Sequence, residues 1–209
     1  MATSLLEQSA AEHLPVYYRL TVGQLHQMLA LGVIQDGEPI ELVDGVLVRK
    51  DRRDAGGEPM SHGKRHAKSV RRIGRLSERL QALGYDVQTQ LPVTLSDVSE
   101  PEPDGAIVIA DDNDYGTRHP AADDIAVLFE VSDTSLRYDR TVKKSMYAAA
   151  GVRLYCIVNL RDNVLELYQA PNAASGEYRE QNTFIADGVL SLTLRDGTSF
   201  DVPVADLLP

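Results

Sequence analysis

The stretch IAVLFEVSDTSLRYDRTVKKSMYAAAGVRLYCIVN, residues 125–159, contains two continuous apolar runs with a helical segment between them. The runs 125–131 and 154–159 are rich in β-branched and aromatic residues, and each has the length of one strand. Because neither run alternates between apolar and polar residues, both strands are expected to be buried on both faces of a sheet. Residues 141–150 predict a helix that ends at Gly151 and helps to cover that sheet.

Further strands are predicted on both sides of this stretch. Residues 105–110 form another buried run, and residues 164–169 are expected to pair with 154–159 across a turn at 161–163. The remaining predicted elements are a helix over 21–31, a hairpin over 39–50, a loop over 51–63, a strand over 85–95 and a hairpin around Asp196-Gly197. We predict an α/β fold with a central mixed β-sheet flanked by helices and with extra N-terminal and C-terminal hairpins.

Length and composition exclude several classes of protein. The chain has 209 residues, of which 43% are hydrophobic and 25% charged, as in globular domains and unlike disordered or collagen-like chains. We expect residues 1–18 to be a leader and 19–209 a single domain. No apolar run is long enough for a membrane span, and the N-terminus does not resemble a signal peptide. One cysteine, Cys156, excludes cysteine-based metal sites and a disulfide framework, so a cytoplasmic location is expected.

Positive charge is concentrated in one segment. The net charge is −10, yet eleven of the 21 Lys and Arg residues lie between Arg49 and Arg79, against four acids. Residues 66–83 predict a helix with Val70, Ile73, Leu80 and Leu83 on its apolar face. Its other face carries Lys68, Arg71, Arg72, Arg75 and Arg79. Such a face indicates contact with the DNA phosphate backbone, or else a surface paired with acids or with a partner subunit.

Two carboxylates flank neighbouring predicted strands. Asp104 directly precedes the strand 105–110, and Glu130 lies near the end of the strand 125–131. If these strands pair antiparallel, both carboxylates lie at the same edge of the sheet. Burial of a lone carboxylate is costly, whereas Mg²⁺ is commonly held by one or two carboxylates together with substrate phosphates. The alternative is a strand end that simply emerges into water.

The predicted helix after the second strand has one polar face. Asp139, Lys143 and Tyr147 are spaced by four residues and therefore share that face. This spacing would bring the Lys143 ammonium close to the two carboxylates, or would form an ordinary Asp–Lys pair at the surface.

Three segments together carry a more specific pattern: PEPDGAIV (101–108), VLFEVSDTSLRYDRTVKKSMYAAAGV (127–152) and LYCIVNL (154–160). Its core is E-V-S-D-T-S followed, after a spacer, by D-x3-K-x3-Y-x3-G-V, and the earlier E-L-V-D-G-V-L (41–47) also matches. From about Tyr18 to Pro171 the chain resembles the Uma-two family of restriction endonucleases, which belongs to the PD-(D/E)XK nuclease superfamily. The resemblance implies a restriction endonuclease-like core and metal-dependent cleavage of DNA.

The resemblance also implies roles for individual residues. Asp104 corresponds to the Asp of the Pro-Asp signature, and Glu130 to the acidic residue of E-x-K. Ser132 stands where the superfamily has its lysine, and Lys143 on the following helix is the implied substitute. Glu41 matches an acidic position that supplies an outer metal ligand.

One residue departs from the family pattern. Relatives usually end the last of these strands with Asp, where this chain has Asn159. The change indicates either harmless capping or a copy that has drifted from the active form.

We therefore predict a metal-dependent DNA endonuclease that uses Mg²⁺, with Mn²⁺ as a substitute. The metal would lie on Asp104 and Glu130 and lower the pKa of a bound water, while Lys143 would stabilise charge on the scissile phosphate. His66 at the start of the basic helix is expected to line the cleft, together with Asp139 and Tyr147. A homodimer is expected by analogy with restriction-type nucleases that cut both strands.

Two other functions fit the same sequence. A nuclease fold that has lost hydrolysis and only binds DNA or protein would agree with the acidic net charge and with Asn159. A zinc hydrolase would use His62 and His66, four residues apart, together with a carboxylate, although Gly63 stands where zincin proteases have their catalytic Glu. Metal-dependent cleavage of a plasmid distinguishes the first alternative, and metal content distinguishes the second.

Overall fold

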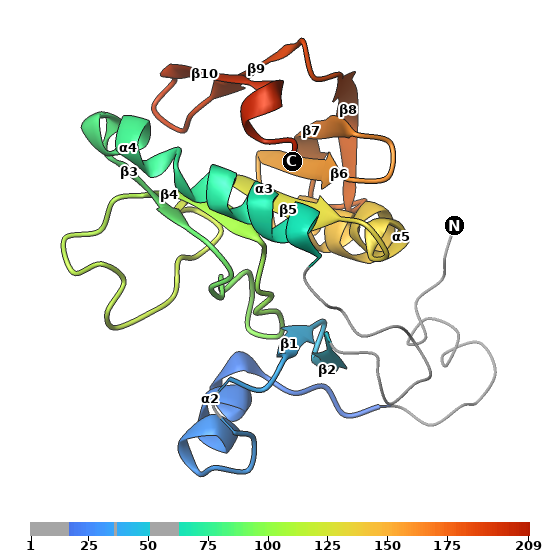
Figure 1. Ribbon diagram of the computed structural model, residues 1–209. Helices are drawn as coiled ribbons and strands as arrows, with labels where there is room; N and C mark the ends of the chain where they lie inside the picture. Colours follow the sequence, from blue (N-terminus) through green and yellow to red (C-terminus); the bar gives the residue numbers. More distant parts are fainter. Residues whose placement is uncertain (1–16, 36, 51–62) are drawn as a thin grey trace.

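A six-stranded sheet forms the centre of the computed structural model, which describes residues 17–35, 37–50 and 63–209 (Figure 1). The strand order is β3-β4-β5-β6-β7-β8. The strands are β3 (Tyr85–Gln88), β4 (Gly105–Ile109), β5 (Ile125–Ser132), β6 (Leu154–Asn159), β7 (Val164–Asn172) and β8 (Glu177–Phe184). Strands β5 and β6 run parallel, whereas the other neighbours are antiparallel. The predicted α/β class with a mixed sheet is confirmed.

The central strands β5 and β6 are buried along their whole length. Side chains of α3 (Lys64–Gly74) and of the C-terminal hairpin β9–β10 share one hydrophobic cluster with Phe129 and Val131. Met146 and Tyr147 of α6 (Lys144–Ala149) share a second cluster with Leu128. Both faces of the sheet are therefore covered, which explains why the runs 125–129 and 154–158 show no alternation of apolar and polar residues.

The basic helix is shorter than the sequence predicts. Helix α3 ends at Gly74 and is followed by α4 (Ser77–Leu80) and the 3₁₀ turn η2 (Gln81–Leu83). Because the helix is interrupted after Gly74, the residues beyond it no longer follow the 3.6-residue period of the predicted apolar face. Leu76 is buried in the core, whereas Leu83 is 37% exposed and was wrongly placed on the apolar face.

The helical segment after β5 begins earlier than predicted and changes its winding. It runs through α5 (Leu136–Tyr138), a π-helical turn η3 (Asp139–Lys143) and α6. Such π turns within helices are rare and are often found at functional sites. Here the turn buries the two charged residues at its ends, Asp139 and Lys143.

Two smaller units lie on opposite sides of the sheet (Figure 1). Helix α2 (Val22–Ala30), which has Thr21 as N-cap, lies with the hairpin β1 (Ile40–Val43) and β2 (Val46–Arg49). The other side carries the hairpin β9 (Val189–Thr193) and β10 (Ser199–Pro203), followed by the 3₁₀ turn η4 (Val204–Asp206). Both hairpins were predicted, whereas β8 was not, and β3 ends well before residue 95.

Some predictions lie outside the described residues: the leader, apart from residues 17–18, and the loop over 51–63, apart from Gly63. His62, one half of the alternative zinc pair, is among them. None of the described helices is long and apolar enough to cross a bilayer.

Candidate active site

Asp104 lies where β4 begins, at the edge of the sheet where β5 ends. Gly105 pairs with Phe129, so the antiparallel register places Asp104 beside Glu130, as the strand pairing predicts. The backbone N–H of Val131 donates to Asp104 Oδ2 at 2.8 Å. His66 Nε2 of α3 lies 3.1 Å from the same oxygen. Asp104 is therefore held from two elements, the sheet and the basic helix.

Gly105 permits this approach of the helix to the sheet. A Cβ atom at residue 105 would lie 2.6 Å from Ile73 Cγ2, a distance at which the α3 side chain would have to move. The Asp-Gly sequence therefore places a carboxylate next to a position where a helix can pack closely against the strand.

Glu130 is buried beneath the helix that follows β5. Its Oε1 atom accepts hydrogen bonds from Lys143 Nζ at 2.8 Å and from the Tyr147 hydroxyl at 2.7 Å. Lys143 Nζ also lies 3.3 Å from Glu41 Oε2, which accepts a hydrogen bond from the backbone N–H of Glu102. The ammonium of Lys143 therefore bridges two carboxylates that are far apart in the sequence.

Lys143 and its neighbour Lys144 have different surroundings. Lys144 Nζ lies 3.7 Å from Glu177 and 5.5 Å from the centre of the Tyr168 ring, away from the carboxylates. Ser132, at the end of β5, donates to Asp139 Oδ2 at 2.6 Å. The face predicted from the spacing of Asp139, Lys143 and Tyr147 is therefore buried against this edge of the sheet, and is not an Asp–Lys pair at the surface.

The site holds more buried negative than positive charge. Burial raises the pKa of Glu130 to about 8, against the opposing effect of the Lys143 charge. Burial also raises the pKa of Asp139. Burial would lower the pKa of Lys143, but the charges of Glu130, Glu41 and Asp139 raise it well above its usual value.

Asp104 differs from the other acids of the site. Burial would raise its pKa, but the hydrogen bond and charge of His66 hold the pKa below its usual value, with further help from the Val131 N–H. Asp104 is therefore the carboxylate of this group that is stabilised as an anion.

The carboxylate oxygens are not gathered into a three-ligand cage. In the part of the chain that the structure describes, one group of three potential ligand atoms lies within 4.8 Å of one another, and it does not contain Glu41, Asp104 or Glu130. The physical reason is the position of Lys143, whose ammonium contacts both Glu41 and Glu130. His66 and the Val131 N–H contact Asp104 through Oδ2, and Lys143 and Tyr147 contact Glu130 through Oε1.

Tyr138 is a site residue that the sequence reasoning missed. Its hydroxyl is buried and has no hydrogen-bond partner among the described residues. Burial raises its pKa, and so do the nearby charges of Glu41, Asp139 and Glu130. The sequence offered one signal for Tyr138, its position directly before Asp139. Tyr138 and Lys143 are five residues apart, a spacing that a π turn brings to one side of the helix but an α-helix does not.

Asn159 has a local structural role. Its side-chain carbonyl accepts the backbone N–H groups of Arg161 and Asp162, and its amide donates to Asp162 and to Glu166. These bonds form the turn between β6 and β7, which agrees with the capping interpretation of this departure from the family pattern.

The basic face of α3 and α4 divides into two groups. Arg72 donates to the carbonyl of Ala205, and Arg79 donates to the carbonyl of Asp201 and stacks over Phe200. These two side chains hold the C-terminal hairpin. The other members, Lys68, Arg71 and Arg75, are exposed, as is Arg79. The outward orientation of the face is confirmed, although two of its arginines also contact the protein itself.

Comparisons with known proteins identify the family and the fold of this chain. The family model Uma2, described as "Putative restriction endonuclease", matches residues 22–203. A crystal structure of a "putative nuclease belonging to DUF820" from Anabaena variabilis is similar with a TM-score of 0.63 and 13% sequence identity, over 90% of this chain and 97% of that one. No curated protein matches the sequence.

The fold is thus that of a restriction endonuclease-like protein, with acidic residues at the sheet edge where β4 begins and β5 ends. The chain belongs to the Uma2 family. Membership of this family supports a nuclease function.

Proposed function

We propose that this protein is a divalent metal-dependent endonuclease that hydrolyses phosphodiester bonds of DNA, with Mg²⁺ as the metal and Mn²⁺ as a substitute. The observation that carries the proposal is that partly buried Asp104 lies beside the buried pair of Glu130 and Lys143 at one sheet edge. An acidic group of this kind, with a single bridging lysine, can accept a cation and a phosphate together.

The residues present fit a hard divalent cation. Glu41, Asp104, Glu130 and Asp139 supply carboxylate oxygens, and Lys143 alone does not balance their charge. Mg²⁺ commonly takes one or two carboxylates and fills its other positions with water and phosphate oxygens, so a complete protein cage is not required. Asp104 and Glu130 would hold the ion, which when bound lowers the pKa of a water molecule and polarises a phosphate oxygen. Glu41 would act from outside the direct ligand pair.

The remaining side chains would orient these groups. His66 and the Val131 N–H fix Asp104 through one oxygen, so that the other could bind a metal ion. Tyr147 and Lys143 do the same for Glu130. Lys143 carries a positive charge that would stabilise the negative charge developing on the phosphate. Ser132 does not replace the superfamily lysine chemically, but positions Asp139.

The exposed basic residues Lys68, Arg71 and Arg75 would contact the DNA backbone without reading its sequence. Arg72 and Arg79 would contribute less, because their guanidinium groups already bind backbone carbonyls of the C-terminal hairpin. We propose a single domain from residue 19 onward, acting as a homodimer where both strands are cut.

Cleavage of supercoiled plasmid in Mg²⁺ or Mn²⁺ tests the proposal. We expect nicked and linear products from the wild type, none in EDTA and none from Asp104→Asn. The matched control is Asp187→Asn, which changes an exposed carboxylate and should leave cleavage intact. Plasmid binding without cleavage by the wild type in both metals would overturn the proposal and favour a binding module.

A further inference from the structure

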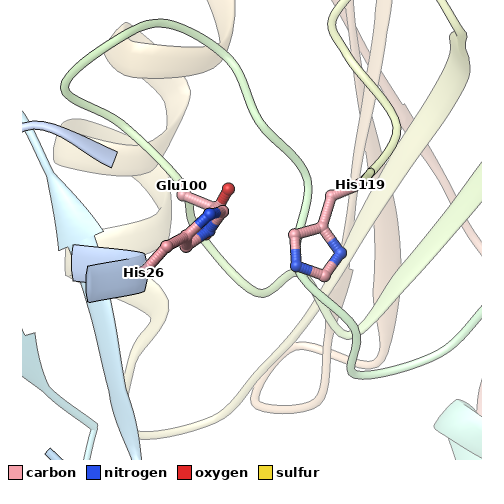
Figure 2. Close-up of side chains that lie close together, drawn as sticks. All are labelled: His26, Glu100 and His119. Atoms are coloured by element: carbon pink, nitrogen blue, oxygen red, sulfur yellow. The ribbon is translucent and has the colours of Figure 1, made fainter. Parts of the chain in front are cut away.

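Three potential metal ligands converge outside the carboxylate group. His26 of α2, Glu100 and His119 each place one ligand atom within 4.8 Å of the other two (Figure 2). His26 Nε2 lies 2.7 Å from Glu100 Oε1, and the His26 and His119 rings meet edge to face with centroids 6.0 Å apart.

The backbone segments that carry these side chains are fixed. Glu100 pairs with Leu42 of β1 through two backbone hydrogen bonds. The segment that holds His119 is tied down at the next residue, because the Pro120 carbonyl accepts the N–H of Thr94 at 2.8 Å. Helix α2 begins with a complete capping box at Thr21. The convergence is therefore a property of three anchored segments.

The carboxylate is also oriented by an outer hydrogen bond. Glu100 is buried, and while Oε1 faces His26, Oε2 accepts a hydrogen bond from the Thr94 hydroxyl at 2.7 Å. Ligand carboxylates in metal sites are commonly held in this way by a second group. A simple His–Glu ion pair would need neither the second imidazole nor this orientation.

We propose that His26, Glu100 and His119 form a zinc site that is separate from the nuclease site. Two imidazoles and one carboxylate, with a fourth position left for water, are a ligand set that suits Zn²⁺ better than Mg²⁺. The His26 side chain is 49% exposed, so an ion can enter from solvent. Around a zinc ion the ligand atoms would lie closer together than 4.8 Å, and rotation of the His26 and His119 rings, neither of which is buried, would bring them to that separation.

The site would join the N-terminal unit to the sheet. His26 lies on α2, whereas His119 lies in the connection between β4 and β5. Glu100 pairs with Leu42, the neighbour of Glu41, whose carboxylate contacts Lys143. Zinc would therefore stabilise the position of β1, and through it the outer carboxylate of the nuclease site.

Zinc titration of the EDTA-treated full chain tests the proposal by calorimetry, with Mg²⁺ in excess to occupy the carboxylate site. We expect one Zn²⁺ per chain and a rise in the unfolding temperature on zinc addition. His119→Ala and Glu100→Gln should each weaken zinc binding by at least about tenfold, and Thr94→Val by about 10- to 100-fold through loss of the outer hydrogen bond.

Two variants separate this site from others. Asp104→Asn removes a carboxylate of the nuclease site, and His62→Ala removes the alternative zinc histidine; both should retain the zinc. Co²⁺ in place of Zn²⁺ should give a visible absorption that His119→Ala abolishes, while circular dichroism confirms that the variant is folded. The proposal is overturned if the wild type binds no zinc, if folded His119→Ala keeps wild-type affinity, or if Asp104→Asn loses the ion. None of these results depends on DNA cleavage.

Discussion

Two groups of buried charge lie at the central sheet, and they are built differently. The first contains Glu130 with Lys143 and further acids. The second is centred on Glu166 of β7. Its two oxygens accept hydrogen bonds from Arg140 at 2.6 and 3.0 Å, from Tyr168 at 2.7 Å and from Asn159 at 2.8 Å.

The pKa values of the two glutamates move in opposite directions. Burial raises the pKa of Glu130 to about 8. Burial would also raise the pKa of Glu166, but the hydrogen bonds from Arg140, Tyr168 and Asn159 lower it below its usual value. A carboxylate whose two oxygens are both bonded is a structural group, whereas one left in an excess of negative charge is suited to binding a cation. Burial alone does not distinguish them.

The largest difference is expected from neutralising each glutamate in turn. Glu130→Gln removes a proposed metal ligand, and should slow plasmid cleavage by about 10³-fold, because a bound metal supplies several kcal/mol of transition-state stabilisation. Glu166→Gln should leave the cleavage rate within about twofold and lower the free energy of unfolding by about 1–2 kcal/mol, because Arg140 is partly exposed. Equal cleavage rates for the two variants would contradict the distinction.

Lys143 and its neighbour Lys144 provide a second test of the difference between the buried site and its surroundings. Lys143→Ala should slow cleavage by about 10²-fold and cost about 3 kcal/mol of stability, because Glu130 and Glu41 lose their shared cation. Lys144→Ala should cost less than about 0.5 kcal/mol, since its partner Glu177 is exposed. Chemical denaturation and plasmid cleavage measure both effects. A greater loss of activity from Lys144→Ala would show that the wrong lysine has been assigned.

Opposite pH dependences should follow from the two glutamates in metal-free protein. Folded Glu130 holds a proton that the unfolded chain releases near pH 4.5, so its contribution to stability falls as the pH rises from 4.5 to about 8. The contribution of Glu166 is present above about pH 4.5 and is lost as the pH falls through its lowered pKa.

Unfolding free energies of wild type, Glu130→Gln and Glu166→Gln across pH 3–8 measure these contributions. The stability of the wild type relative to Glu130→Gln should decrease between pH 4.5 and 8, and Mg²⁺ should reverse the decrease, because it binds the ionised carboxylate. Relative to Glu166→Gln, the advantage of the wild type should disappear in acid. If both differences in unfolding free energy had the same pH profile, the proposed contrast between Glu130 and Glu166 would be wrong.

The smallest expected effect separates the two groups of basic residues. Arg71→Glu with Arg75→Glu should flatten the log–log salt slope of DNA binding by up to about two, at about 0.9 per lost phosphate contact. Arg72→Glu with Arg79→Glu should change that slope less and lower the unfolding temperature, because these side chains hold the C-terminal hairpin. The slope is measured with duplex DNA in EDTA. Equal slopes for both double variants would show that the two groups of arginines do not differ in DNA binding.

Local periodicity accounts for what the sequence by itself determined. The apolar runs of β5 and β6 predict strands covered on both sides, because burial of both faces removes the polar alternation. Antiparallel pairing of two such runs is sufficient to place Asp104 beside Glu130. The four-residue spacing of Asp139, Lys143 and Tyr147 likewise predicts one shared face. The motif pattern indicated the same family whose model matches residues 22–203.

Tertiary packing decided which charges have partners. Glu41 contacts Lys143 because β1 packs against the helical segment after β5, whereas the next residue, Lys144, contacts Glu177. Arg72 and Arg79 contact the C-terminal segment, although the sequence places them on the same helix face as Arg71 and Arg75. His26, Glu100 and His119 gather from three segments with no shared motif. A periodic pattern encodes which side of an element is buried, but the partner on that side depends on contacts between distant segments.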